Sequence, residues 1–386
     1  MKILEFGPED KKLVKEMYRF PHRLYKDYPA WVPLLKMDLL GNKLLGSKGL
    51  LCSDHPFFQH ARACYFLVQD ESGVTLGTIA AVVNHSHNEY HKEKTGFFGF
   101  FEFINNPEVA KLLLDKAKAW LTAQGMEAMR GPANFSTNDT IGLLIENFDD
   151  MPFMYTPYNP PYYQEILENY GLAKKMDLLA ELMPVQLDKE SDESKKIERM
   201  DKVAQKIKER YNVTVETFVP KRHLSVIKEL YLDAWKDNWG FVPLSDPEYK
   251  ILADNLKLAA DRQMIYIAYV AGKPAGFLGS LPDINEVLHK NKKGPEILQL
   301  LKIFWKLKRK KFLRQRLMLF GIKEEYRKMG LDALMFLEGF KNARKRNYEQ
   351  VEISWLLETN TLVIQAGLRL NAVVYRKWRV YETPLG

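Results

Sequence analysis

The chain has 386 residues, of which 46% are hydrophobic and 27% are charged, a balance that is typical of a folded protein of two domains and excludes a disordered, collagen-like or coiled-coil chain. Its two cysteines exclude a disulfide scaffold and a cysteine-rich zinc site, and the lack of a membrane-span-length apolar stretch or a secretory signal predicts a cytoplasmic protein. The net charge is +8, but residues 289–316 alone contribute +10, which places the basic charge on one element and disfavours a broad nucleic-acid-binding face.

In the first half of the chain, two apolar runs separated by a glycine turn predict a β-hairpin over residues 65–80. A strand over residues 97–103 then leads into a helix. Asn106 as the cap, Pro107 at the first helical position and Glu108 in the first turn are an ordinary helix start, without a glycine turn or basic residues. We therefore expect that this helix start binds no phosphate.

Between these elements, His85, His87 and His91 are the obvious candidates for metal ligands. His85 and His87 would share one face of a strand, but no carboxylate or cysteine motif completes a metal site. We expect a surface loop here and no bound metal.

The middle of the chain is dense in charge. Residues 186–212 contain eight basic and seven acidic residues, which is typical of a solvated surface helix preceded by a flexible connection. We therefore expect a linker over residues 186–211.

The second half repeats the pattern of the first. Residues 26–34 align without gaps on residues 236–244, and a second hairpin is expected over residues 265–278. Each half then continues with a helix, a strand and a Thr-Asn pair, Thr137-Asn138 and Thr359-Asn360. Such collinear matches indicate a duplication, and each copy predicts a mixed sheet flanked by helices, an α/β architecture.

The basic stretch at residues 289–316 is an insertion in the second copy. Its apolar residues recur at helical spacing, so an amphipathic helix followed by a basic run is expected. We favour a helix that packs on its own domain with a solvated basic face, and the alternative is contact with an acidic partner, an anionic membrane surface or tRNA. The apolar positions are Ile297, Leu300, Leu301, Phe304 and Leu307.

An apolar strand at residues 316–322 is followed by a turn with Gly330 and by a helix over residues 333–345. A glycine-containing turn that opens a helix directs backbone N–H groups outward at the positive end of the helix dipole. Arg327 and Lys328 add positive charge, so this turn predicts a phosphate or pyrophosphate site.

The Arg327-x-x-Gly330-x-Asp332 turn resembles the Arg/Gln-x-x-Gly-x-Gly/Ala signature of the GNAT superfamily of acyl-coenzyme A-dependent N-acyltransferases, with Asp332 where the superfamily has Gly or Ala. Asn360 at the next strand-to-helix turn is similar as well. The resemblance covers most of residues 213–382 and extends to the first half through the repeat. It implies a bacterial protein of two tandem GNAT-like domains, residues 1–185 and 212–386, of which the first lacks the coenzyme A turn.

The resemblance also implies a cosubstrate and a reaction. Acetyl-CoA or another acyl-CoA is the expected cosubstrate, its thioester lies along a splayed strand, and an amine attacks the carbonyl while a backbone N–H polarises it. The helix after Asn360 lacks the Tyr that many GNAT enzymes place there, so no proton donor to the thiolate is assigned. The residues expected to hold the cosubstrate are Phe320, Gly321, Ile322, Arg327, Lys328, Met329, Gly330, Leu331, Asp332 and Asn360.

Two carboxylates are candidates for the general base that deprotonates the amine. Glu358 lies at a turn beside Asn360, and Glu352 lies on the preceding strand, where alternation with Ile353 turns it away from the apolar side. The alternative for Glu352 is a solvated carboxylate at the strand edge, so we prefer Glu358.

The acceptor pocket is expected from two loops of the first half that are rich in amides, hydroxyls and phenols, although a purely structural role is an equal alternative. Three functions stay open: acyl transfer, most simply acetyl transfer, to a small amine or amino-acid-like acceptor; an aminoacyl-tRNA-dependent peptidyl-type transferase; and a non-catalytic ligand-binding protein. The candidate acceptor-binding residues are Asn134, Ser136, Asn138, Tyr155, Asn159 and Tyr163.

Overall fold

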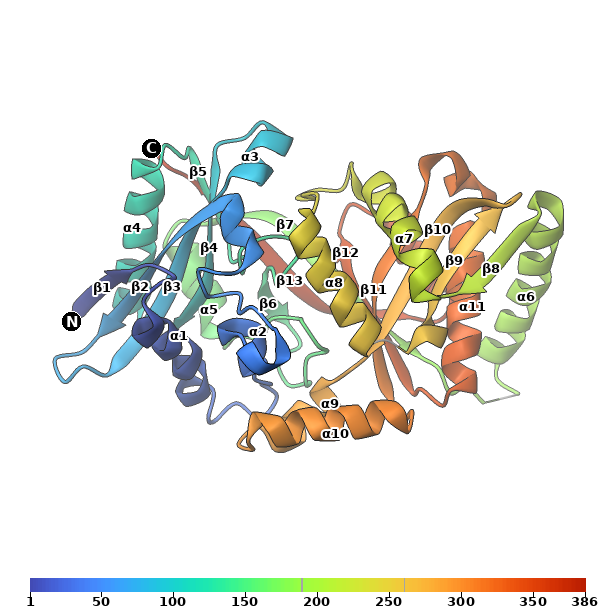
Figure 1. The fold of residues 1–386 in the computed structure, drawn as a ribbon, viewed down its shortest axis with the longest axis horizontal. Coiled ribbons are helices and arrows are strands. Elements are labelled where there is room, and N and C mark those ends of the chain that lie inside the picture. The colour runs from blue at the N-terminus through green and yellow to red at the C-terminus, as the bar shows by residue number, and fades with distance from the viewer. Residues whose placement is uncertain (189, 260) are drawn as a thin grey trace. The chain divides into compact units, whose positions relative to one another are not determined.

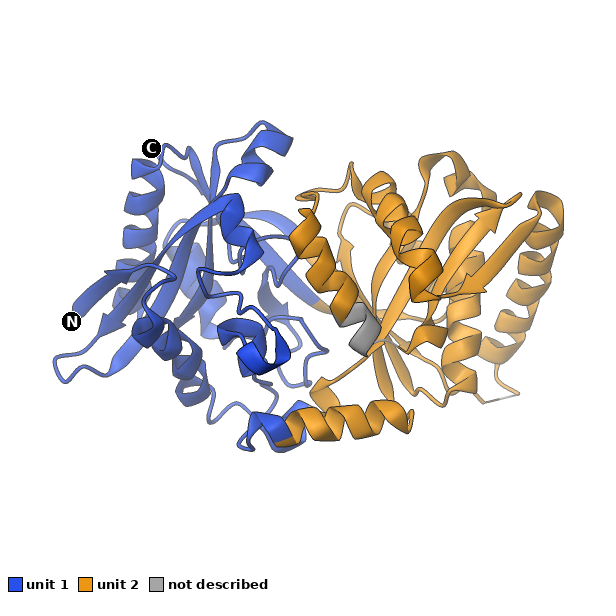
Figure 2. Ribbon diagram, viewed as in Figure 1, with its two compact units in different colours: residues 1–177, 288–297, 377–386 blue, residues 178–287, 298–376 orange. Residues whose placement is uncertain are grey.

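The computed structural model describes residues 1–188, 190–259 and 261–386 (Figure 1). The chain forms two compact units (Figure 2). Unit 1 contains residues 1–177, 288–297 and 377–386, and unit 2 contains residues 178–287 and 298–376.

The first half of the chain alternates strands with helices, as the hydrophobic pattern predicts. Its hairpin is longer than expected, and the strand expected before Thr137-Asn138 ends at Gly131. The elements are β1 (Lys2–Phe6), α1 (Lys11–Leu24), α2 (Lys36–Leu40), β2 (Ala61–Gln69), β3 (Thr75–Asn84), α3 (His85–His91), β4 (Thr95–Phe103), α4 (Pro107–Ala123), β5 (Ala128–Gly131), β6 (Leu143–Glu146), α5 (Tyr162–Asn169) and β7 (Ala173–Pro184).

The second half follows the same order with two additions, a long helix before its first strand and the basic helix after its hairpin, and its described residues contain no counterpart of β6. The elements are α6 (Asp192–Tyr211), β8 (Val213–Thr217), α7 (Pro220–Trp235), α8 (Asp246–Ala259), β9 (Ile265–Val270), β10 (Lys273–Pro282), α9 (Asn285–Leu288), α10 (Glu296–Lys308), β11 (Arg314–Ile322), α11 (Leu331–Lys345), β12 (Gln350–Leu357), α12 (Thr361–Arg369) and β13 (Val373–Pro384).

The sheets of the two units have equivalent strand orders. In unit 1 the order is β1-β2-β3-β4-β5, with β4 and β5 parallel and the other pairs antiparallel. In unit 2 the order is β8-β9-β10-β11-β12, with β11 and β12 parallel. The registers agree, since Gly77 pairs with Phe103 as Gly276 pairs with Ile322. The predicted tandem α/β architecture is therefore confirmed.

The last strand of each sheet comes from the other half of the chain. Residues 178–184 of β7 pair with β12 and belong to unit 2, whereas residues 381–384 of β13 pair with β5 and belong to unit 1. A domain boundary at residue 185, as expected from the sequence, follows chain order and therefore does not place β7 in unit 2 or the end of β13 in unit 1. The local hydrophobic pattern cannot predict this pairing, because the sequence of a strand does not specify which strand pairs with it.

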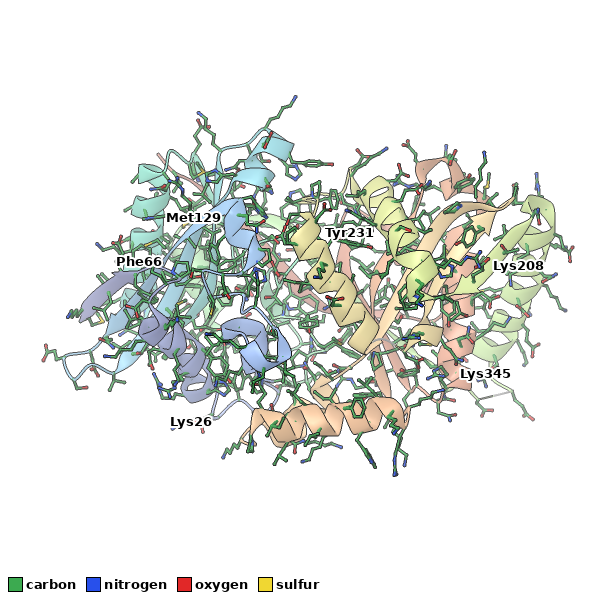
Figure 3. All side chains as sticks on the ribbon, viewed as in Figure 1. Lys26, Phe66, Met129, Lys208, Tyr231 and Lys345 are labelled. Carbon is green, nitrogen blue, oxygen red and sulfur yellow. The ribbon has the colours of Figure 1, made fainter. Side chains whose placement is uncertain are left out.

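The charged segment in the middle of the chain is mainly the helix α6, as expected. It packs on α11 of unit 2: Lys208, labelled in Figure 3, donates to Glu338 at 2.6 Å, and Lys341 donates to Asp201 at 2.7 Å. Most of the proposed linker is thus part of unit 2, and Lys189 lies outside the described residues.

The core of unit 1 lies between its sheet and α4. Val109 and Leu113 of α4 are fully buried against β3, where Gly77 leaves the space that their side chains occupy. In unit 2, α11 covers the sheet in the same way with Leu334 and Met335, both fully buried. Each unit therefore has its own apolar core, which positions the strand ends described below.

Candidate functional site

The candidate site of unit 2 lies where β11 and β12 separate. These parallel strands pair over only four positions, from Arg314 with Gln350 to Leu317 with Ile353. Beyond Leu317, β11 continues to Ile322 and stays paired with β10, across a register shift in the ladder. One edge of β11 is thus not covered by β12 over residues 318–322, which has the form of the splayed strand that the resemblance implies.

The backbone direction along this edge follows from the antiparallel ladder. Lys323 donates its N–H to Ala275 of β10 at 2.9 Å, one position beyond the pairing of Ile322 with Gly276. Because hydrogen-bonded pairs alternate with pairs that bond outward, the N–H and C=O groups of Phe320 and Ile322 point away from β10. Their carbonyls accept bonds from Trp235 Nε1 (2.8 Å) and Arg327 Nε (3.2 Å). The N–H groups of Phe320 and Ile322 therefore face the edge that β12 leaves open.

The strand runs into the predicted turn and helix. A 3₁₀ helix spans Glu324–Met329, and Gly330 has φ +77°, a left-handed conformation that favours glycine. The first hydrogen bond of α11 runs from Leu334 N–H to Gly330 O at 3.2 Å. The N–H groups of residues 331–333 precede this bond and lie at the positive end of the helix. The turn therefore has the geometry of an anion site.

The charged side chains of the turn have different roles. Arg327 donates to the carbonyls of Ile322 and Ala234, so it ties the turn to the end of α7 while keeping its charge beside the turn. Lys328 is exposed, and Asp332 is half-buried in the first turn of α11. Met329 is half-buried, whereas Leu331 is fully buried, so Leu331 offers only its backbone. The Lys328 ammonium is thus exposed beside the turn.

Glu352, the alternative base, is completely buried in a polar network on β11, β12 and β13. Ser354 donates to its Oε1 at 2.6 Å, Arg316 Nε lies 3.5 Å from the same oxygen, and Tyr375 donates to Oε2. Arg316 is itself only 1% exposed and lies over the ring of Trp355. The prediction that Glu352 turns away from the apolar side holds, but its surroundings are a buried ion pair rather than solvent, and a solvated edge carboxylate is wrong.

This network sets the charge state of its tyrosine. Burial, followed by the charge of Glu352, raises the pKa of the Tyr375 phenol well above its usual value. Tyr375 is therefore a neutral donor at any physiological pH. The sequence pattern did not single out this phenol, because the site signature places the proton donor on the helix after Asn360, and Tyr375 lies beyond it on β13.

Glu358 and Asn360 lie at the end of β12, as expected. Both are half-buried. Asn360 precedes α12 and donates its N–H to Leu357 O at 2.8 Å, and its side chain makes no capping bond to the helix. The Asn360 amide is thus available at the carboxyl end of β12, and the role of Glu358 as the base stays a prediction.

Unit 2 contains a further buried carboxyl, which the sequence pattern did not predict. Glu181 on β7 is paired with Ile353, is 0% exposed, and neither of its carboxyl oxygens has a hydrogen-bond partner within the described part of the chain. Burial raises its pKa to about 8. Its carboxyl reaches the backbone of Gly367 on α12, where any side chain would collide with it. A lone acid in the apolar run of β7 is the signal that could have revealed it.

Unit 1 closes the corresponding strand edge with its own chain. Here β4 and β5 pair over three positions, ending at Phe97 with Arg130. Asn134 then accepts the N–H of Phe100 at 2.7 Å, donates to Thr140 at 2.7 Å, and the backbone of Ala133 occupies the space over Gly99. The helix after β4 begins with the expected cap, Asn106 accepting from Glu108 N–H at 2.9 Å.

The other candidate acceptor residues of unit 1 lie in loops with internal hydrogen bonds. Ser136 donates to Asp139 at 2.9 Å and accepts from Asn138 N–H, and Asn159 is buried with both amide atoms bonded to Leu144. These contacts show structural roles for the buried members of the set, and their role in acceptor binding stays a prediction.

Two tyrosines of the set lie in stronger electrostatic surroundings. Tyr163 is buried, donates to Glu102 at 2.8 Å and accepts the N–H of Phe103. Tyr25 also donates to Glu102, and burial raises the pKa of this carboxyl to about 7. The charge of Asp38, followed by burial, raises the pKa of Tyr155 well above its usual value.

The histidines lie on a helix rather than in the expected surface loop, so that expectation is wrong. His85–His91 is the helix α3, in which His87 is buried and lies 3.4 Å from Glu93. Burial, then the nearby charges of His91 and Arg130, lowers the pKa of His87 to about 4. Among the residues that the structure describes, no three His, Cys, Asp or Glu side chains are grouped to hold a metal ion.

No helix in the described ranges has both the length and the apolar character that crossing a bilayer requires. No protein-family model matches the chain. Two curated proteins are similar along nearly their whole length. The Escherichia coli protein YghO is 32% identical over 377 residues, 97% of this chain and 93% of that protein. A bacterial ceramide synthase of Caulobacter vibrioides is 29% identical over 385 residues, 96% of this chain and 95% of that protein.

Solved structures share the fold. A tandem GNAT protein from the clavulanic acid biosynthesis pathway is 11% identical, with a TM-score of 0.56 over 100% of this chain and 98% of the other. At this identity the likeness concerns the fold alone, and it agrees with the repeated sheet of the two units. The chain therefore belongs to the family of the Escherichia coli protein YghO, and its two units have the tandem fold of the GNAT N-acyltransferase superfamily.

Proposed function

We propose that this protein transfers an acyl group from an acyl-CoA to an amine, with unit 2 holding the thioester. The pyrophosphate would lie at the N-terminus of α11 and the pantetheine arm along the open edge of β11. The observation that carries the proposal is this edge, because the N–H groups of Phe320 and Ile322 face it and the N-terminal turn of α11 lies directly after it in the chain.

The strand edge and the helix start differ between the two units, and this difference supports the proposal. In unit 1 the side chain of Asn134 takes the N–H of Phe100, and the helix after β4 begins with a side-chain cap. In unit 2 the described residues fill neither position: β12 leaves β11 after Leu317, and α11 begins without a side-chain cap. We therefore assign acyl-CoA to unit 2 alone.

The chemistry requires three contributions from the protein. The amine nitrogen attacks the thioester carbonyl, a base takes the proton of that nitrogen, and the C–S bond breaks to release the thiolate of coenzyme A. The N–H of Phe320 or Ile322 would stabilise the oxyanion, a contribution that is often worth a hundredfold or more in rate. Glu358 at the end of β12 is our candidate base, because the carboxylate of Glu352 is already occupied by Arg316, Ser354 and Tyr375.

For the acceptor, we propose a long-chain amine. The relative named as a bacterial ceramide synthase matches 96% of this chain, and a ceramide is by definition an N-acylated long-chain amino alcohol. The small amine and the acetyl group that the sequence favours are the alternative. The same reaction at the same edge serves both, so the acceptor is decided by assay.

The assay incubates the purified chain with palmitoyl-CoA or acetyl-CoA and with a long-chain amino alcohol, a short polyamine or an amino acid, and identifies amides by mass spectrometry. We expect the long-chain amide as the main product. Formation of only short acetyl-amides would overturn the acceptor while keeping the reaction. Amide formation that requires aminoacyl-tRNA, or no amide from any pair, would overturn the proposal.

The site is tested by Gly330→Glu, which places a carboxylate at the anion site. Gly330 has φ +77° and its side-chain space is limited by Ile207, so some loss of stability is expected. Gly272→Glu is the matched control, since Gly272 has φ +79° in the β9–β10 hairpin and lies in open space. We expect only Gly330→Glu to raise the KM for acyl-CoA by tenfold or more.

A further inference from the structure

The helix α10 turns apolar side chains to solvent. Leu301 is 56% exposed, Phe304 is 65% exposed and Trp305 is 49% exposed, and Leu298 is exposed beside them. The helix packs on its own domain and keeps a solvated basic face, as expected, but its buried positions are Gln299 and Ile303 rather than the expected apolar residues Leu301 and Phe304. Exposed apolar residues that are grouped in this way mark an interaction surface.

Cations surround these apolar side chains. Lys302 and Lys308 are exposed on the same helix, and the exposed residues Arg309, Lys310 and Lys311 follow it. The Arg309 guanidinium lies over the Trp305 ring, 4.4 Å from its centroid. The sequence contains no acidic residue from residue 297 to residue 316. We define the α10 surface as Leu298, Leu301, Lys302, Phe304, Trp305, Lys308 and Arg309.

The opposite side of α10 is anchored, and this anchoring fixes which side faces solvent. Lys306 pairs with Glu286, and its ammonium lies 4.6 Å from the centroid of Phe312. Ile303 is 8% exposed. Glu286 also accepts the N–H groups of Leu313 and Arg314 at 2.9 and 2.7 Å. Rotating the helix to hide its apolar residues would break these contacts.

We propose that the α10 surface binds the surface of an anionic lipid bilayer. A helix with bulky apolar residues in the centre, an aromatic ring and flanking Lys and Arg lies in the interface plane, where the apolar side chains enter the acyl boundary and the cations meet the headgroups. A nucleic acid would use the cations but not the centre of Leu301 and Phe304. A second copy of the chain would oppose like charge to like charge.

The test is sedimentation of the full chain with vesicles of phosphatidylcholine alone or with 30% phosphatidylglycerol. We expect binding to the anionic vesicles and weak binding to the neutral ones. Each cation near the surface contributes about a fivefold change in affinity, so Lys308→Gln with Arg309→Gln is expected to weaken binding by more than tenfold. Leu301→Ser with Phe304→Ser is expected to do the same at low salt.

The controls use exposed apolar residues elsewhere. Leu362 is 71% exposed and Val203 is 57% exposed, and Leu362→Ser with Val203→Ser is expected to leave vesicle binding unchanged. Because all these positions are exposed, circular dichroism should show the same fold in every variant. A blue shift of tryptophan emission on anionic vesicles that is lost in Trp305→Phe would support insertion of this ring.

Several results would overturn the proposal. These are equal binding to both vesicle types, vesicle binding that both α10 variants retain, and an effect of the control substitutions as large as that of the α10 substitutions. Tight binding of the α10 surface to tRNA without vesicle binding would reassign it to a nucleic acid, and a dimer that Leu301→Ser with Phe304→Ser dissociates would reassign it to self-association. None of these readouts requires acyl transfer, so they are independent of the proposed reaction.

Discussion

The buried carboxyl of Glu181 makes a sharp prediction about stability and pH. Glu181 is inaccessible to solvent and neither of its oxygens is hydrogen-bonded within the described residues, so burial raises its pKa from 4.5 to about 8. The folded protein therefore keeps the proton at neutral pH, whereas the unfolded chain releases it near pH 4.5. Replacing Glu181 by Gln, a neutral side chain of the same shape, removes this titration.

The sign follows from proton linkage. Between pH 4.5 and pH 8 the native state binds more protons than the unfolded state, so this group lowers the free energy of unfolding as the pH rises. One pKa unit is worth about 1.4 kcal/mol, which gives an upper limit of about 5 kcal/mol across the interval from 4.5 to about 8. Structural relaxation and water entry reduce this limit, so we expect Glu181→Gln to gain at least about 2 kcal/mol relative to wild type between pH 5 and pH 8.5.

The measurement is urea unfolding of wild type and Glu181→Gln at half-unit steps from pH 5 to pH 9. The difference between the two curves isolates Glu181 from the other carboxyls with raised pKa values, Asp38 and Glu102. Glu349→Gln removes a charge at an exposed position of the same unit and should show no such trend. A difference that stays constant within about 0.5 kcal/mol across this range would refute the buried, unpartnered state of Glu181.

Two further substitutions test the buried ion pair of unit 2 and the closed strand edge of unit 1. Glu352→Ala leaves the Arg316 guanidinium buried without its carboxylate, so it should lower the free energy of unfolding, measured in urea, by about 3–5 kcal/mol. Ser354→Ala should lower it by less. A loss below about 1 kcal/mol in Glu352→Ala would show that the ion pair is not buried. Asn134→Ala leaves the Phe100 N–H without its side-chain acceptor and should lower the free energy of unfolding by about 1–3 kcal/mol. The acyl-CoA affinity, measured by calorimetry, should stay the same. A large change in that affinity would contradict the assignment of acyl-CoA to unit 2.

The parts of this fold that local chemistry determines could be predicted. Glycine turns between apolar runs specify the two hairpins, the Asn106 cap specifies the start of α4, and Gly330 specifies the turn before α11, because each depends on a few neighbouring residues. The duplication added the order of elements in each unit. These signals were sufficient for the tandem architecture and for the strand and turn of the candidate site.

The parts that depend on which elements meet could not be predicted. The alternation of β12 turns Glu352 to one side, but only the structure brings Arg316 and Tyr375 to it. The helical spacing of α10 marks its apolar side correctly, yet contacts of Ile303 and Lys306 decide that this side faces solvent. The burial of Glu181 could not be predicted either, because α12, and not its own strand, covers its carboxyl.

We infer that each chain binds one acyl-CoA, in unit 2. Isothermal titration of the full chain with a non-hydrolysable palmitoyl-CoA thioether tests it most directly, with Gly330→Glu and Gly272→Glu titrated in parallel. We predict a stoichiometry of one in wild type and in Gly272→Glu, and loss of binding in Gly330→Glu. Two molecules per chain, or one molecule that Gly330→Glu still binds with wild-type affinity, would contradict it.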